Sequence, residues 1–386
     1  MRSIGRSFVP LAVAALIALP APARAAGDGN VLRATLGNGL RVVIVRNTLS
    51  PVVTTEINYL AGSNEAPNGF PGMAHAEEHM MFRGSPGLSA SQLSTIVAAL
   101  GGESNADTQQ VVTQYFLTVP ADALETALRI EAIRMRGASN TEELWTLERG
   151  AIEQEVAQDL SDPRYVFYMR LLESLFAGTP YAHDALGTRP SFDNTTGAML
   201  RKFHGDWYAP NNAILVIVGD VDPARGLALV KGLFGPIPRR ALPPRPGVRL
   251  GPLEPAAISL ETDLPYGLAA VAYRLPGYRS PDYAAGQLLA DVLDSERGNL
   301  YALVPDGKAL AAGFDAEAFP EAGFGYASAA FPPGGNGAAL VSELKVIVAG
   351  YVRDGIPPAL VEAARRREIA DAEFRKNSVE GLAAAW

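Results

Sequence analysis

The order of predicted secondary structure repeats along this 386-residue chain, and the repeat limits the folds open to it. Residues 31–235 alternate strand-like and helix-like segments, residues 236–255 are rich in Pro and Arg, and residues 256–386 follow a similar order. A recurring order of elements predicts two structurally related domains joined by a linker. The mixture of strands and helices predicts an α+β fold, with two mixed or antiparallel sheets each backed by helices.

Turn residues and apolar alternation place the elements of the first half. They predict a hairpin at 31–46, a strand at 52–60, strands within 103–119, a strand at 214–218, and helices at 89–100, 121–135 and 141–160. The pair Asn38-Gly39 is typical of a hairpin turn. Ser91 and Thr141 are expected to cap the helices that follow them.

The second half predicts strands at 257–275 and 323–331, and helices at 282–293, 338–352 and 358–380. The helix at 358–380 corresponds to the one at 141–160, but the first half then continues for about 60 residues more. The second half stops at Trp386. The repeat therefore predicts a second domain that is incomplete at its C-terminus, as in a fragment or a shortened form.

The first 25 residues resemble a secretory signal peptide. Arg2 and Arg6 precede an apolar stretch, and Ala23-Arg24-Ala25 supplies a cleavage site of the A-x-A kind. An uncleaved anchor is the alternative interpretation. No later segment has 18 unbroken apolar residues, so no membrane span is expected in the mature chain.

Charge and cysteine content exclude several classes of protein. The net charge is −8, and loss of residues 1–25, with three arginines and no acid, makes it −11. An acidic surface argues against nucleic-acid binding. Because the chain has no cysteine, it has no disulfides and no thiolate metal ligands, so histidines and carboxylates must hold any metal.

The pentapeptide His75-Ala76-Glu77-Glu78-His79 reads H-x-x-E-H, the inverse of a common zinc-peptidase motif. On a helix, residues four apart share a face, so His75 and His79 are expected to bind one metal ion. Glu78 lies beside them and is suited to take a proton from water. The pattern predicts a hydrolytic metal site rather than a structural zinc clamp, against the alternative of a polar helix face that happens to carry two histidines.

A third metal ligand has to come from elsewhere in the chain. Glu148 and Glu155 are the best candidates, because they lie two turns apart on one face of the helix predicted at 141–160. Glu153 is expected to point away from that face. His183 and His204, the only other histidines, match no metal-binding spacing.

Several stretches resemble the pitrilysin, insulinase and mitochondrial processing peptidase family, and within it the shorter bacterial members. The segment Gly72–Gly84 resembles the family's zinc helix, and Glu148-Arg149 followed by Ile152 and Glu155 resembles its second metal motif. Residues 207–212 and 214–221 resemble the end of its first domain. The resemblance runs from about residue 31 to the end of the chain, and it implies half of a clamshell-like peptidase chamber.

The resemblance also implies roles for single residues. His75, His79 and Glu155 would bind one Zn²⁺ per chain, Glu78 would act as general base, and Glu148 would orient a ligand or the water. Asn105 and Ala106 would lie on an edge strand that binds the substrate backbone. The alternatives are a solvated helix carboxylate for Glu148 and a turn-former for Asn105.

One departure from the family pattern bears on partners. Active members usually carry an Arg and a Tyr that bind the substrate near the metal. Here Pro305 and Ala312 occupy the matching positions. We therefore expect pairing with a related chain, as a heterodimer that supplies both residues or as a homodimer.

These observations predict a secreted, periplasmic zinc metalloendopeptidase that hydrolyses peptides or unfolded segments. One alternative is a non-catalytic scaffold or assembly subunit of the same fold. The missing Arg/Tyr pair leaves room for it, and the intact His75, Glu78, His79 and Glu155 argue against it. Another is a metal- or peptide-binding protein without hydrolysis, which leaves Glu78 unexplained because Glu78 is a base rather than a ligand.

Overall fold

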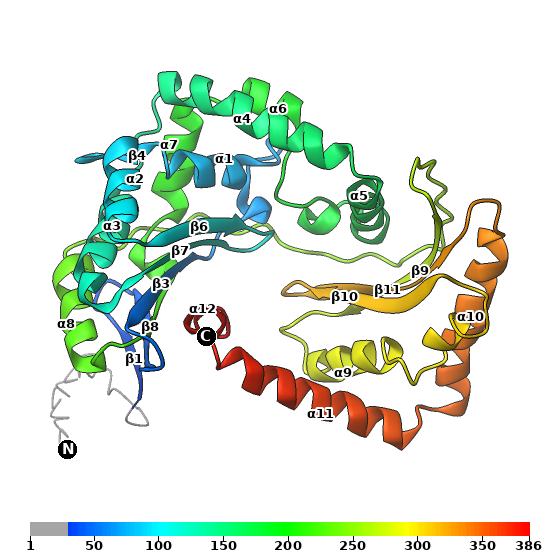
Figure 1. Cartoon of the computed structure of the whole chain (residues 1–386). Coiled ribbons are helices and arrows are strands. Elements are labelled where there is room, and N and C mark those ends of the chain that lie inside the picture. Colours follow the sequence, from blue (N-terminus) through cyan, green and yellow to red (C-terminus); the bar gives the residue numbers. More distant parts are fainter. Residues whose placement is uncertain (1–29) are drawn as a thin grey trace, which may run out of the picture.

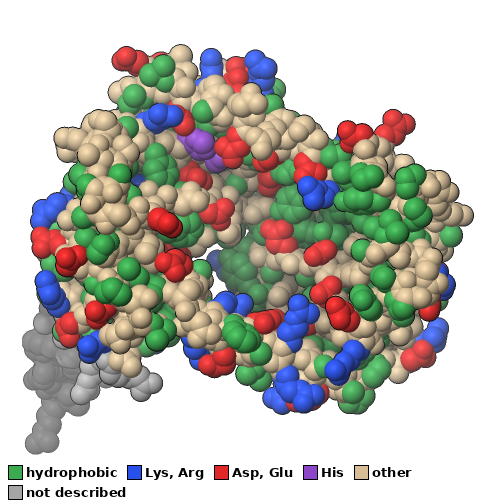
Figure 2. All heavy atoms as spheres, in the orientation of Figure 1, with side chains coloured by type: hydrophobic (Ala, Val, Ile, Leu, Met, Phe, Trp, Pro, Cys, Tyr) green, Lys and Arg blue, Asp and Glu red, His purple; other side chains and the backbone are tan. Residues whose placement is uncertain are grey.

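The structure, a computed structural model, describes residues 30–386 (Figure 1). The signal peptide predicted at residues 1–25 lies outside the described residues. Two β-sheets, each covered by helices, form two halves that face each other, and the space-filling view shows a hollow between them (Figure 2). The predicted α+β class is confirmed.

The first sheet has six strands in the order β1-β2-β8-β3-β7-β6. Their bounds are β1 (Val31–Thr35), β2 (Arg41–Arg46), β3 (Val52–Tyr59), β6 (Glu103–Thr108), β7 (Thr113–Pro120) and β8 (Ala213–Gly219). Only the β2–β8 pair is parallel, and the predicted hairpin is present as β1 and β2. Strand β6 forms one edge, so one row of its backbone groups has no partner in the sheet.

Helices cover one face of this sheet. They are α1 (Met73–Met80), α2 (Ala90–Ala99), α3 (Leu124–Arg136), α4 (Glu142–Leu160), α6 (Arg189–Asn194), α7 (Gly197–Trp207) and α8 (Pro223–Phe234), with a small hairpin of β4 (Gly84–Ser85) and β5 (Leu88–Ser89). Alternate strand residues such as Val42, Ile44, Val53 and Ile57 point into the core below the helices. This period of two is what a half-buried strand requires.

The second sheet has three antiparallel strands in the order β10-β11-β9. They are β9 (Gly267–Pro276), β10 (Ala311–Ala318) and β11 (Ala322–Phe331), and helices α9 (Tyr283–Leu293), α10 (Gly337–Asp354) and α11 (Pro358–Arg375) pack with them. The order strand, helix, two strands, two helices thus matches β3, α2, β6, β7, α3 and α4 of the first half. Strand β10 was not predicted from the sequence.

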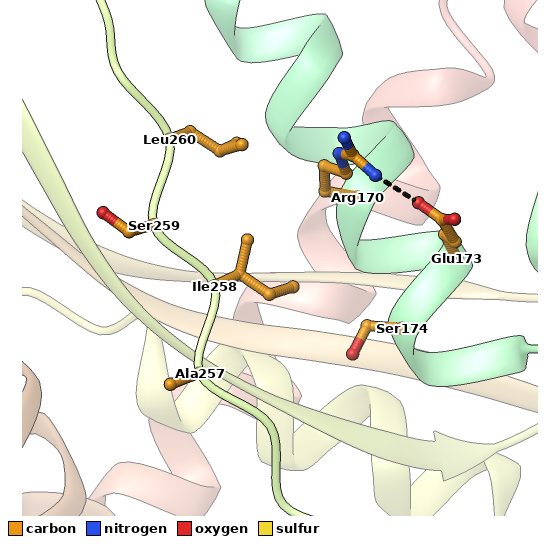
Figure 3. A pocket seen from close by; sticks show the side chains of 7 residues that line it. All are labelled: Arg170, Glu173, Ser174, Ala257, Ile258, Ser259 and Leu260. Atoms are coloured by element: carbon orange, nitrogen blue, oxygen red, sulfur yellow. Dashed lines mark hydrogen bonds and ion pairs between the residues drawn. The ribbon is translucent and has the colours of Figure 1, made fainter.

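The strand predicted from Ala257 is wrong for its first ten residues, because regular structure begins only at Gly267. The segment Ala257–Leu260 runs beside helix α5 (Pro163–Phe176), with a groove of about 390 Å³ between them (Figure 3). Ile258 and Leu260 point toward the helix and Ser259 points away. The alternation of apolar and polar residues in this segment therefore reflects its contact with helix α5. The segment has no ladder of backbone hydrogen bonds to a neighbouring strand.

Two predicted helix boundaries are also wrong. Ser89, rather than Ser91, caps α2, because the Ser89 side chain accepts from the Gln92 N–H and the Gln92 side chain accepts from the Ser89 N–H. The helix predicted at 358–380 ends at Arg375, and Ser378 caps a separate helix α12 (Val379–Ala384). Thr141 caps α4 as predicted.

Each half contributes one helix to the opposite half. Helix α5 packs on the face of the second sheet that α9 and α10 leave open, through Leu172 and Phe176 against Phe319 and Phe324. Helix α12 packs on the corresponding face of the first sheet, against valines of β2 and β8 (Figure 1). The two halves are therefore held together by two helix-on-sheet contacts. Within residues 30–386, no helix is long and apolar enough to cross a membrane.

We predict that Phe176→Ala lowers the free energy of unfolding by about 3–5 kcal/mol, because Phe176 is fully buried between α5 and the second sheet. Urea denaturation followed by fluorescence would measure the change. The matched control is Phe374→Ala, since Phe374 is 71% exposed and its loss should cost no more than about 0.5 kcal/mol. Equal denaturation midpoints for the two variants would contradict the contact.

Candidate metal centre

Helix α1 is short, and its first turn is fixed by a close approach of two chain segments. Gly72 at its N-cap has φ +90°, and a Cβ there would lie 2.7 Å from the Cα of Gly187 and 2.6 Å from the Phe192 ring. A side chain at position 72 is therefore excluded by both conformation and space. Met73, Ala74, Ala76 and Met80 are buried, which leaves the histidine face of α1 turned toward α4.

His75, His79 and Glu155 come together although α1 and α4 are far apart in the sequence. The two Nε2 atoms are 3.2 Å apart, and oxygens of Glu155 lie 3.6 Å from Nε2 of His75 and 3.4 Å from Nε2 of His79. These three side chains form a group able to hold a metal ion. Glu155 is 45% exposed at its side chain, so the group opens to solvent on that side.

The hydrogen bonds of the ring Nδ1 atoms set the tautomer of each histidine. Nδ1 of His75 lies 3.1 Å from the carbonyl oxygen of Leu186, and Nδ1 of His79 lies 2.9 Å from Oε1 of Glu148. Neither acceptor has a proton to give, so each Nδ1 carries the hydrogen and each Nε2 presents a lone pair. Two lone pairs facing each other at 3.2 Å repel, and either a proton or a metal ion between the two Nε2 atoms removes that repulsion.

The donor set fits zinc. Two nitrogens bound at about 2.0–2.1 Å in tetrahedral geometry stand about 3.3 Å apart, close to the separation of the two Nε2 atoms. Two imidazoles and one carboxylate are also the ligand set of several catalytic zinc sites, which keep a fourth position open.

Glu148 lies behind His79, where it accepts the Nδ1–H and also pairs with Arg83. Burial alone would raise the pKa of Glu148, but the hydrogen bonds from His79 and Arg83 outweigh burial and lower it. For Glu155, the hydrogen bond with His79 lowers the pKa. Arg83 was not predicted from the sequence, because no motif marks its contact with a residue 65 positions away.

The pKa of the His79 imidazole is raised to about 9 in the metal-free chain. Burial would lower it, but the hydrogen bonds to Glu148 and Glu155 and the charge of Glu78 dominate. Without a metal, His79 therefore carries a second proton at neutral pH. A metal ion has to displace that proton, because only a neutral imidazole has a free lone pair.

Glu78 lies next to the donor group and is partly buried. Burial raises its pKa, against the opposing effects of a hydrogen bond from Thr108 and the charges of His75 and His79. The Thr108 hydroxyl donates to Oε2 of Glu78 at 2.5 Å. The sequence analysis missed Thr108, although its place on β6, two residues after Ala106, is a signal that could have found it.

The other residues singled out in the sequence lie outside this group. Asn105 and Ala106 are on the edge strand β6, and Oδ1 of Asn105 accepts from the Ala106 N–H at 2.9 Å. His183 contacts the Asp184 carbonyl. His204 packs on Tyr208, and burial lowers its pKa to about 4.

Pro305 and Ala312 lie in the second half, Pro305 in a turn and Ala312 on β10. Ala312 is partly buried against the second core, and neither side chain has a polar group to offer a substrate.

Family models match most of the chain. "Insulinase (Peptidase family M16)" matches residues 41–189, and "Peptidase M16 inactive domain" matches residues 194–368. The chain belongs to the pitrilysin/insulinase family of peptidases. The first match contains all five residues of the candidate site, namely His75, Glu78, His79, Glu148 and Glu155.

Individual relatives agree with this assignment. The chain is 28% identical over 290 residues to "Zinc protease PqqE" of Helicobacter pylori, an alignment covering 72% of this chain and 64% of that protein. The chain covers only 45–64% of the lengths of the first curated relatives.

Two solved structures share the fold. A protease from Helicobacter pylori has a TM-score of 0.82 at 25% identity, covering 91% of this chain and 87% of that one. The first half of the periplasmic protease PqqL from Escherichia coli has a TM-score of 0.73 at 21% identity, covering 94% and 80%. At that identity the second likeness shows the fold alone.

We predict that the apparent affinity for Zn²⁺ rises about tenfold per pH unit between pH 6.5 and 8.5, because His79, with its pKa of about 9, must lose a proton. Competition with a chromophoric chelator would measure it. His183→Ala, outside the group, should keep the same slope. An affinity independent of pH would contradict a site built on His79.

Proposed function

We propose that this chain is a zinc-dependent endopeptidase subunit that hydrolyses peptides or unfolded segments. The observation that carries the proposal is the convergence of two Nε2 lone pairs and a carboxylate beside Glu78. Zn²⁺ held by His75, His79 and Glu155 would supply a Lewis acid that polarises the scissile carbonyl. One ion per chain is expected.

Glu78 is proposed as the general base. Thr108 occupies Oε2, and within residues 30–386 no group donates a hydrogen bond to Oε1. Oε1 is therefore available to take the proton of the attacking water and to return it to the leaving nitrogen. Glu148 is proposed to assist by holding His79 in the tautomer that leaves Nε2 free.

Substrate is proposed to bind as an added strand on the edge of β6, where Asn105 and Ala106 lie. Backbone hydrogen bonds to a strand edge give affinity without strict sequence choice. The acids around the site, among them Glu78, Asp107 and Glu155, are compatible with cationic peptides. Export to the periplasm is proposed from the signal-like residues 1–25.

We propose in addition that the site is completed by a related subunit, in a heterodimer or a homodimer. Pro305 and Ala312 cannot form the hydrogen bonds that an Arg and a Tyr would give a substrate. The same observation favours the second candidate function, a scaffold subunit that does not hydrolyse peptides. The complete donor group and Glu78 favour the peptidase.

We predict that Glu78→Gln abolishes hydrolysis, lowering kcat at least about a hundredfold, because an amide cannot take a proton. Zinc content should stay at one ion per chain, since Glu78 is not among the donors. A quenched fluorescent peptide library and elemental analysis would measure the two quantities. The control is Glu173→Gln on α5, an exposed carboxylate that should leave both unchanged. Hydrolysis that survives in Glu78→Gln would overturn the assignment of the base.

The partner is tested by assaying the chain alone and together with a related subunit copurified from its native source. We predict zinc binding in both samples, and a rate at least about a hundredfold higher in the pair, since the loss of substrate-positioning groups costs that much. Full-rate cleavage by the single chain would exclude the need for a different partner. Zinc without activity in either sample would favour the scaffold function.

A further inference from the structure

Thr108 ends the edge strand β6 and points to the face that the helices cover. Side chains alternate along a strand, so Ser104, Ala106 and Thr108 share one face while Glu103, Asn105 and Asp107 share the other. Ala106 packs against the core below the helices, and Thr108 reaches Glu78 on α1. The edge strand and the helix of the candidate metal centre are thus joined by a side-chain hydrogen bond.

The Thr108 hydroxyl donates to only one of the two carboxylate oxygens of Glu78. It bonds Oε2 at 2.5 Å, and Oε1 receives no hydrogen bond from residues 30–386. A glutamate side chain has several rotamers, and holding it in one of them costs conformational entropy. A bond from a β-branched residue at the end of a strand opposes that motion, because Thr has few rotamers of its own.

We propose that Thr108 is a positioning residue: its hydroxyl holds Glu78 with Oε2 occupied and Oε1 free to take the proton of the attacking water. Thr108 acts through Glu78 and forms no bond to the substrate. Because it belongs to β6, it also fixes the base relative to the strand on which a peptide is proposed to dock. This inference rests on the proposed role of Glu78 as general base.

The test compares Thr108→Val, which keeps the shape and removes the hydroxyl, with Thr108→Ser, which keeps the hydroxyl. Loss of a hydrogen bond to a charged group corresponds to about a ten- to hundredfold change. We predict that Thr108→Val lowers kcat by that factor with KM changed less than about twofold, since the bond acts in the reaction and not in docking. Thr108→Ser should recover most of the rate.

The matched control is Thr118→Val on the neighbouring strand β7. Thr118 faces the opposite side of the sheet, where its hydroxyl contacts Thr54 and lies 3.4 Å from Oε1 of Glu380 on α12. It loses a hydroxyl of the same kind without touching Glu78, so kcat should not change. Thermal unfolding of all variants would show whether a lower rate reflects lost stability.

A second measurement does not depend on turnover. In the Glu78→Gln background, a labelled peptide should bind with the same Kd whether position 108 is Thr or Val. A weaker Kd with Val would assign Thr108 to substrate docking and overturn the proposal, as would an unchanged kcat in Thr108→Val or a failure of Thr108→Ser to recover the rate. If Glu78→Gln itself keeps activity, the proposed function fails, and the result is distinct from a failure at Thr108.

Discussion

The packing of α1 against α4 is the constraint on which the candidate metal centre depends. An eight-residue helix has little stability of its own, so its position is set by the groups it buries. One of them is Glu77, which is fully buried and accepts a hydrogen bond of 2.6 Å from the Asn140 side chain. Burial raises the pKa of Glu77 well above its ordinary value. Since Asn140 directly precedes the cap of α4, this bond fixes the two donor-bearing helices to each other.

The second half contributes no metal donor among the described residues, yet it supports the helix that carries one. Helix α4 leads through two residues into α5, and α5 is embedded in the face of the second sheet. Arg274 on β9 strengthens this contact, because its guanidinium donates to the last turn of α5 at Leu175. The second half therefore also constrains the position of α4, the helix on which Glu155 lies.

The carboxylates around the two histidines differ in burial: Glu148 is buried and Glu155 is partly exposed. His75 and His79 are surrounded by carboxylates, of which Glu148 has its pKa lowered by hydrogen bonds from His79 and Arg83 while Glu155 is open to solvent. The buried carboxylate accepts a hydrogen bond from the His79 ring, and the exposed one faces the two Nε2 atoms. Two carboxylates on one helix thus have different electrostatic environments because their burial and partners differ.

The sequence by itself predicted the donor group of the candidate metal centre, which the structure brings together. The spacing of His75 and His79 requires a shared helix face, and Glu148 and Glu155 share a face for the same reason, because both follow from the helical repeat. The six strands of the first sheet and the helices α1 to α4 were predictable from local alternation and caps, whereas helices α5 to α8 were not predicted. What the sequence could not show depends on contacts between distant segments. Thr108 and Arg83 acquire their partners only through folding, and the segment from Ala257 is extended against a helix rather than paired in a sheet. The exchange of α5 and α12 between the halves was decided by the tertiary structure alone, since an apolar helix face does not encode which sheet will bury it.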